Sequence, residues 1–196
     1  MHRSRPFRAA LLGLLGVAAA SCSDSTAPAD TRPPSALTFL QLKVSSPPLL
    51  ANSITFAACE GQQAEGQLFF DDGSGHEGEE FARLKLDSHS LLAHPDGTPF
   101  APGECIDITM SKDPASTDIM VQLEPSGLKF DSSHPAELRL DYGEAEDVDP
   151  IVLARVGIWR QEKPSDPFVL IGSAIQTDLL KFRANLTGFS RYALAY

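Results

Sequence analysis

Positive charge is scarce in this sequence of 196 residues. It has 16 Lys and Arg against 26 Asp and Glu, so its formal net charge is −10. The first 21 residues contain Arg3, Arg5 and Arg8 and no acids, so the rest of the chain carries a charge of −13. A surface with this excess of negative charge repels the phosphate backbone of nucleic acids. We therefore exclude nucleic acid as a partner.

Long hydrophobic runs are also missing, which argues against an ordinary membrane-spanning helix. The longest run, residues 9–20, has twelve residues, whereas the hydrocarbon core of a bilayer requires about 20. The run follows three arginines and ends in small residues before Cys22. This order of a basic start, a short apolar run and small residues is the pattern of a secretory signal. We therefore assign residues 1–21 to a signal peptide.

The end of that signal, Ala19-Ala20-Ser21-Cys22, resembles the bacterial lipobox, in which a cysteine after small residues is lipidated and becomes the first residue. It departs from the lipobox at Ala19, where Leu, Val or Ile is usual. The resemblance implies lipidation of Cys22 and a membrane anchor in the cell envelope. Cleavage after Ala20 that leaves Cys22 as a plain thiol is the alternative. Ser23, in place of an aspartate, favours the outer membrane, on its periplasmic or surface face.

Residues 22–35 are polar and rich in proline, with nothing to bury. A segment of this composition cannot offset the entropy of ordering, so we expect a disordered tether between the anchor and the folded part.

Cysteine is scarce as well, with three residues in the chain. If Cys22 is lipidated, Cys59 and Cys105 remain as a pair in an oxidising compartment, and we expect a disulfide between them. Two buried free thiols are the alternative. Neither cysteine has a second cysteine or a histidine at ligand spacing, so we expect no metal site and no other cofactor.

Helical periodicity is absent, and a period of two dominates from residue 36 onward. Apolar and polar residues alternate in ECIDITMS (104–111), AELRLDY (136–142), VLARVGIW (152–159) and LLKFRANL (179–186). Turn signals rich in Pro, Gly and Asp separate these runs. The pattern predicts an all-β fold, an antiparallel β-sandwich over residues 82–196. Residues 36–81 also contain strand-like runs, which belong either to the same sandwich or to a small addition.

Four segments in this order resemble a ZU-five domain, the β-sandwich named after zonula occludens and a netrin receptor. They are HPDGTPFAPGECIDITMSKDP, LEPSGLKFDSSHPAELRLDY, VGIWRQEKPSDPFVLIGSAIQ and LTGFSRYALAY, within residues 82–196. Bacterial secreted and lipid-anchored proteins carry versions of this domain. The resemblance implies a mostly non-enzymatic module that serves in scaffolding and protein contacts.

Some members of that family cleave themselves before the serine of a His-Phe-Ser triplet. Here the corresponding bond is Phe189–Ser190, with Ser190 as the attacking hydroxyl. The position of the histidine is occupied by Gly188, which cannot accept a proton, and losing a positioned base costs about 10²–10⁴ in rate. We expect an uncut final strand, with Gly188 in the preceding turn where a positive φ could be needed.

Four other features suggest sites, and each has a structural interpretation that we prefer. Residues 71–80 are acidic and rich in glycine but lack the spacing of a calcium loop. A second acidic turn contains Asp141, Glu144, Glu146, Asp147 and Asp149 and suits weak calcium binding or an exposed charged loop. Trp159 suits the core or a sugar platform. His89, near Asp87 and two serines, lacks the geometry of a catalytic triad.

The sequence therefore predicts a lipid-anchored envelope protein that is not an enzyme. Its β-sandwich is expected to act as a structural or interaction module toward an unidentified envelope protein. The alternative is a surface lipoprotein that binds calcium or carbohydrate, and the self-cleaving version comes third.

Overall fold

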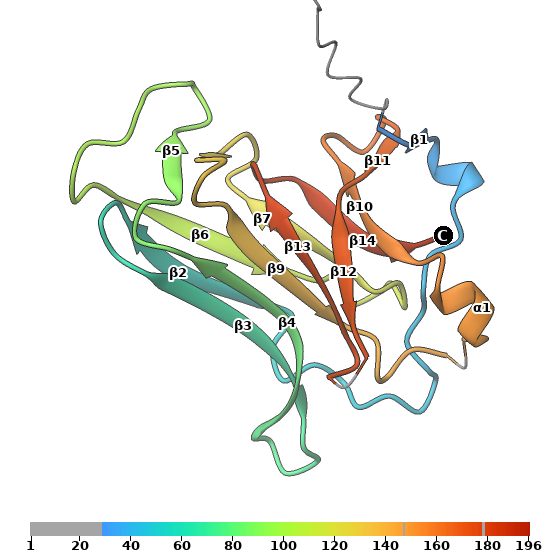
Figure 1. The fold of residues 1–196 in the computed structure, drawn as a ribbon. Helices are drawn as coiled ribbons and strands as arrows, with labels where there is room; N and C mark the ends of the chain where they lie inside the picture. The colour runs from blue at the N-terminus through green and yellow to red at the C-terminus, as the bar shows by residue number, and fades with distance from the viewer. Residues whose placement is uncertain (1–28, 147, 178) are drawn as a thin grey trace, which may run out of the picture.

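The structure is a computed structural model that describes residues 29–146, 148–177 and 179–196. These residues form two antiparallel β-sheets that lie one behind the other (Figure 1). The expected all-β antiparallel sandwich is confirmed. The predicted signal peptide and Cys22 lie outside the described residues. No helix in the described ranges is long and apolar enough to cross a membrane.

The larger sheet has seven strands and the smaller one has five. The order in the larger sheet is β1 (Thr31–Arg32), β11 (Phe168–Leu170), β10 (Gly157–Gln161), β14 (Arg191–Ala195), β7 (Met120–Glu124), β6 (Cys105–Ser111) and β2 (Ser53–Cys59). The order in the smaller sheet is β12 (Ser173–Gln176), β13 (Lys181–Leu186), β9 (Ala136–Asp141), β4 (Glu77–Leu86) and β3 (Ala64–Asp71). A further short pair joins β5 (Leu91–Ala93) to β8 (Lys129–Phe130).

The N-terminal strands belong to the same sandwich. β2 and β3 follow each other in the chain, yet β2 is the edge of the seven-stranded sheet and β3 is the edge of the five-stranded one. The connection between them therefore passes from one sheet to the other and closes that side of the sandwich. Residues 36–81 are not a separate addition.

The main core lies between the two sheets and follows from the alternation of side chains along each strand. Leu138 and Leu140 of β9 are fully buried, as are Ile108 of β6 and Tyr192 of β14. Side chains at alternate positions of a strand point to opposite faces of its sheet. The outer face of the five-stranded sheet carries polar residues of β9 and β13 that are partly or fully exposed, namely Glu137, Arg139, Lys181, Arg183 and Asn185.

A second, smaller apolar cluster covers the outer face of the seven-stranded sheet. Leu37 and Phe39 pack there against Trp159 and Phe168. The segment that carries them pairs with the end of β14, since the Thr38 N–H donates to the Tyr196 carbonyl and the Tyr196 N–H donates back. The tether was expected to extend to Ser35. Instead, Thr31–Arg32 already pairs with β11 and is followed by a 3-10 turn, η1 (Pro34–Ala36).

One predicted strand is wrong in its first half. Residues 152–159 were expected to be extended throughout, but α1 (Pro150–Leu153) is a single helical turn and β10 begins only at Gly157. The Asp149 side chain accepts a hydrogen bond from the Ile151 N–H, and Pro150 occupies the first helical position. An N-cap aspartate followed by proline is a helix-start signal that outweighs the alternation after it.

Candidate interaction surface

Ser190, the predicted nucleophile of self-cleavage, is fully buried and structurally engaged. Its Oγ accepts a hydrogen bond from Arg160 Nε at 3.0 Å. The neighbouring Tyr192 hydroxyl donates to the Gly188 carbonyl oxygen. The groups that surround Ser190 are thus an arginine, which does not accept a proton, and a tyrosine whose pKa is raised by burial.

Gly188 is required for a reason other than the one expected. Its φ is not positive, and a Cβ atom built on it would lie 2.8 Å from the Leu128 carbonyl oxygen. That backbone contact is closer than real Cβ atoms approach, so a histidine at this position would not fit without a shift of the chain.

The acidic hairpin of residues 71–80 uses its carboxylates internally. Asp71 Oδ1 accepts hydrogen bonds from the N–H groups of Gly73 and Gly75. Asp72 Oδ1 accepts from the Ser74 hydroxyl and N–H, which lower the pKa of that carboxyl group. Within the described ranges, no three His, Cys, Asp or Glu side chains come together as metal ligands.

The acidic side chains of the second turn do not gather at one site either. Asp149 caps α1, and Asp147 lies outside the described residues. Asp141 is buried, and this burial raises the pKa of its carboxyl group to about 6, although it accepts a hydrogen bond from the Gly143 N–H. Lys181 lies opposite Asp141 in the sheet.

Trp159 and His89 both make contacts within the fold that differ from those of a sugar platform or a catalytic triad. Trp159 is 2% exposed and its indole N–H donates to the Ala195 carbonyl oxygen at 2.9 Å, so it offers no surface for a sugar. His89 Nδ1 lies 3.4 Å from Glu60 Oε1 instead of facing Asp87. The Ser90 hydroxyl accepts a hydrogen bond from the Asp87 N–H, which makes a turn and not a catalytic triad.

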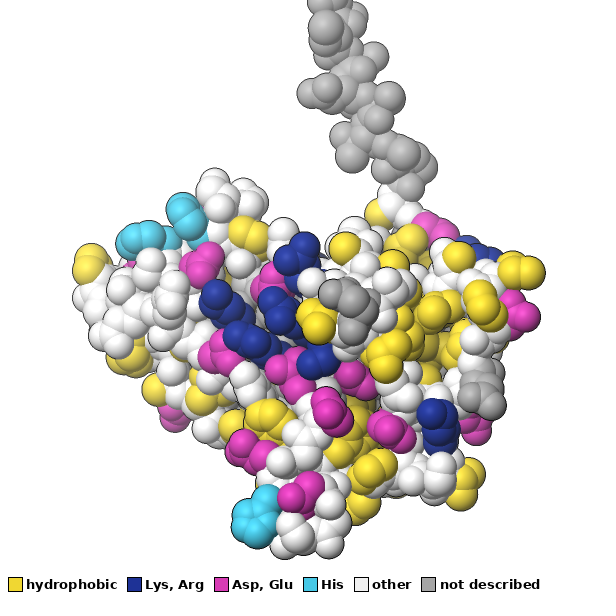
Figure 2. Space-filling model, turned by 60° about the horizontal axis from the view of Figure 1, so that its bottom comes forward, with side chains coloured by type: hydrophobic (Ala, Val, Ile, Leu, Met, Phe, Trp, Pro, Cys, Tyr) yellow, Lys and Arg dark blue, Asp and Glu magenta, His cyan; other side chains and the backbone are white. Residues whose placement is uncertain are grey.

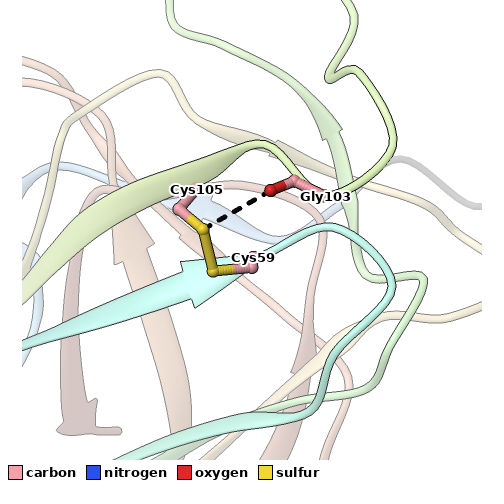
Figure 3. Close-up of a disulfide and its surroundings, with 3 residues drawn as sticks. All are labelled: Cys59, Gly103 and Cys105. Atoms are coloured by element: carbon pink, nitrogen blue, oxygen red, sulfur yellow. Dashed lines mark hydrogen bonds between the residues drawn. A yellow bond between two sulfur atoms is a disulfide. The ribbon is translucent and has the colours of Figure 1, made fainter.

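The predicted disulfide between Cys59 and Cys105 is confirmed. It joins the end of β2 to the start of β6 (Figure 3), and the two Cα atoms lie 3.9 Å apart as direct partners in the sheet. The Gly103 carbonyl oxygen lies 3.6 Å from Cys105 Sγ. We regard this as a contact, because a disulfide sulfur has no hydrogen to donate. The bond fixes an edge strand to its neighbour.

The feature that sequence reasoning missed is a cationic face on the five-stranded sheet. Arg83 of β4 is the register partner of Arg139 of β9, and Arg139 is the partner of Arg183 of β13. We call these three residues the arginine row. Lys85 and Lys181 lie on the same face, each at the next same-face position of its strand. Figure 2 shows Lys and Arg side chains gathered in one group, with Asp and Glu side chains beside it.

The cations of this face are held in place by ion pairs with two glutamates of the same sheet. Arg83 Nη2 lies 2.6 Å from Glu65 Oε2. Glu137 accepts from both of the other arginines, with 2.7 Å to Arg139 and 3.4 Å to Arg183. The four cations Arg83, Lys85, Arg139 and Arg183 thus face Glu65 and Glu137, and Asp87 lies by Lys85, which leaves a surplus of one positive charge.

A shallow hollow of about 210 Å³ adjoins the row. Lys85, Arg139 and Asn185 line it, together with the acids Asp87 and Glu137. Its unpaired donors are the Lys85 ammonium and the Asn185 amide, because Arg139 is already paired with Glu137. Such a set of donors suits a carboxylate or another small planar anion.

Comparison of the chain with protein-family models, with curated proteins and with solved structures finds no match. The resemblance to a ZU-five domain stays a prediction from the sequence.

Proposed function

We propose that this chain is a cell-envelope protein, anchored by a lipidated Cys22, whose β-sandwich acts as a non-catalytic interaction module. The cationic face of the five-stranded sheet is the contact surface in this proposal. The outer membrane, on its periplasmic or surface face, is the proposed location.

The disulfide supports the assignment to the envelope. Structural disulfides form and persist in oxidising compartments and are rare where thiols are kept reduced. The pair that forms it, Cys59 and Cys105, is the pair that remains after the cysteine of the lipobox-like sequence is set aside. The leader and the disulfide are independent features that favour the same compartment.

The cationic face is the observation that carries the assignment to an interaction module. Thirteen Lys and Arg follow residue 21, and five of them gather on one side of one sheet in an otherwise acidic chain. Like charges directly opposite each other destabilise a sheet, and a partner that covered the arginine row would offset that cost. The residues that suggested catalysis, calcium binding or sugar stacking are engaged in turns, caps and core instead.

Site-specific photo-crosslinking in the native envelope tests this proposal. A photoreactive residue replaces Asn185, which is exposed on the cationic face, or Lys163, which is exposed in the β10–β11 turn on another part of the surface. We expect a discrete protein adduct from position 185 and none from position 163. An adduct from position 163 alone would move the contact surface elsewhere. The absence of protein adducts at both positions would overturn the interaction module.

A further inference from the structure

We propose that the arginine row binds a short, extended acidic segment of a partner protein, whose Asp or Glu carboxylates accept the hydrogen bonds that the row leaves unmade. This inference rests on the proposed interaction module and names the chemistry of its partner.

The arginine row and Lys85 have hydrogen-bond donors that no described acceptor uses. A guanidinium group carries five N–H donors in a planar fork. Nε of Arg83 is shielded from water and has no hydrogen-bond partner in the described part of the chain. The Lys85 ammonium makes no hydrogen bond or ion pair with another described residue. Shielding closes Nε to a partner as well as to water, so the donors that Arg83 offers are the others of its partly exposed guanidinium group, of which Nη2 pairs with Glu65.

The arginine row already binds one carboxylate in the geometry that we propose for a partner. The two carboxylate oxygens of Glu137 accept from guanidinium groups on two neighbouring strands, Arg139 on β9 and Arg183 on β13. Neighbouring strands lie about 4.8 Å apart. The corresponding position between Arg83 and Arg139 has no bridging carboxylate in the described structure, since Arg83 pairs with Glu65 on its other side. One carboxylate from a partner would complete the pattern.

The acids around the row limit the length and the charge density of the segment that it can bind. The surplus on the row is small, and acids adjoin it, with Asp87 by the hollow and Glu80 in an ion pair with Lys181. The chain as a whole carries a formal charge of −10. A long or dense polyanion would therefore be repelled by the rest of the surface. A segment with two or three carboxylates meets the cations without this penalty.

The shape of the outer face suits an extended segment. The outer face of the sheet is open, and the hollow of about 210 Å³ beside the row has room for one acidic side chain near Lys85 and Arg139. In an extended peptide, alternate side chains lie on one side, about 6.6 Å apart. Arg83 and Lys85 are also two residues apart on one strand, β4, so two such carboxylates match the spacing of the space beside Arg83 and the hollow beside Lys85. An extended protein segment thus fits both positions.

The test measures binding of a labelled six-residue peptide of alternating Glu and Thr, with three carboxylates, to the disulfide-bonded protein by fluorescence anisotropy. A peptide with Gln in place of Glu is the matched ligand control. We expect the Glu peptide to bind more tightly than the Gln peptide, and to bind more weakly as salt is added. Arg83→Gln and Lys85→Gln are each expected to weaken binding about tenfold, the loss of one charge-assisted contact. Lys163→Gln removes a charge elsewhere and should leave the affinity unchanged.

Circular dichroism and thermal melting of each variant separate loss of binding from loss of fold, and Arg183→Gln provides a second site on the row with a half-exposed side chain. Equal binding of the Glu and Gln peptides would overturn the inference. So would equal weakening by Lys163→Gln, or binding only of a sulfated polysaccharide or of vesicles with anionic phospholipid. A protein adduct at position 185 alongside a failed peptide would leave the interaction module standing and remove the acidic segment alone.

Discussion

Gly188 is a residue whose importance lies in the closeness of two backbones. Its backbone pairs with Lys129, and the Phe189 N–H donates to the Leu128 carbonyl oxygen at 3.0 Å. This approach leaves no room for a side chain. The sequence suggested a turn that needed a positive φ, and that expectation was wrong because the close neighbour, Leu128, lies 60 positions away in the chain. Contacts at this separation depend on the assembled sandwich and are not visible in local sequence.

Replacing this glycine should therefore destabilise the fold. We expect Gly188→Ala to lower the free energy of unfolding by about 1–3 kcal/mol, the usual cost of forcing extra atoms into a packed site. Gly172→Ala is the matched control, because a Cβ atom added at Gly172 would have open space around it within 4 Å and its φ is not positive. Urea unfolding followed by the fluorescence of Trp159 measures both. Equal stability of Gly188→Ala and the wild type would contradict the close approach.

Asp141 makes the free energy of unfolding depend on pH, and the sign of this dependence follows from its raised pKa. Burial raises the pKa of Asp141 to about 6, whereas an aspartate in an unfolded chain has a pKa of about 3.9. Between these values the folded state holds a proton that the unfolded state has released. The free energy of unfolding therefore falls as the pH rises from about 4 to about 6, and this contribution stays lost above pH 6.

Asp141→Asn should remove that dependence. We expect the variant to be more stable than the wild type at pH 7 by about 1–2 kcal/mol, after allowance for solvent screening. The asparagine keeps an oxygen that can accept from the Gly143 N–H. Asp107→Asn, at an exposed position of β6, is the control. Urea unfolding at pH 4, 5, 6 and 7 gives the measurement, and parallel pH profiles for Asp141→Asn and the wild type would show that the buried carboxyl is not the source.

At the scale of elements, alternation predicted the interior strands well and the ends of elements poorly. β9 and β13 coincide closely with the runs AELRLDY and LLKFRANL, because both strands have one face in the core. The helical turn before β10 was missed, since the alternation continued into residues where Asp149 and Pro150 start a helix.

The arginine row shows a different limit of prediction from sequence, which is the pairing of strands. Alternation places Arg139 and Arg183 on the solvent face of their strands. It does not say which strands are neighbours, or which residues are opposite each other. The row exists because β9 lies between β4 and β13 with matched register, and a shift of one residue would turn a strand's side chains to the other face.

The disulfide acts at this scale by fixing an edge strand. β2 has one neighbour in its sheet, β6, and the bond joins them at their last register pair. Removing it with Cys59→Ala and Cys105→Ala together should lower the free energy of unfolding by about 2–4 kcal/mol, because the bond closes a long loop of the unfolded chain. Reduction of the wild type should have a similar effect. A double variant that unfolds at the same urea concentration as the oxidised wild type would contradict a stabilising role.

At the scale of the whole molecule, few residues separate Cys22, the proposed site of the lipid anchor, from the sandwich. The described structure begins at residue 29, and Thr31–Arg32 is already part of the seven-stranded sheet, at the upper right of Figure 1. Cys22 is seven residues before residue 29. A chain spans at most about 3.6 Å per residue, so an acylated Cys22 would hold the sandwich within about 25 Å of the membrane surface.

The anchor is the last prediction, and it is separate from the fold. We expect the wild-type chain to fractionate with membranes and to incorporate labelled palmitate, since buried acyl chains contribute about 0.8 kcal/mol per methylene. Cys22→Ala should move the chain to the soluble fraction without lowering the urea midpoint of the purified sandwich, because no described element contains residue 22. Cys59→Ala with Cys105→Ala should lose stability but retain the label. Palmitate incorporation that survives Cys22→Ala would place the acyl group elsewhere, and a soluble wild type without label would favour plain cleavage after Ala20.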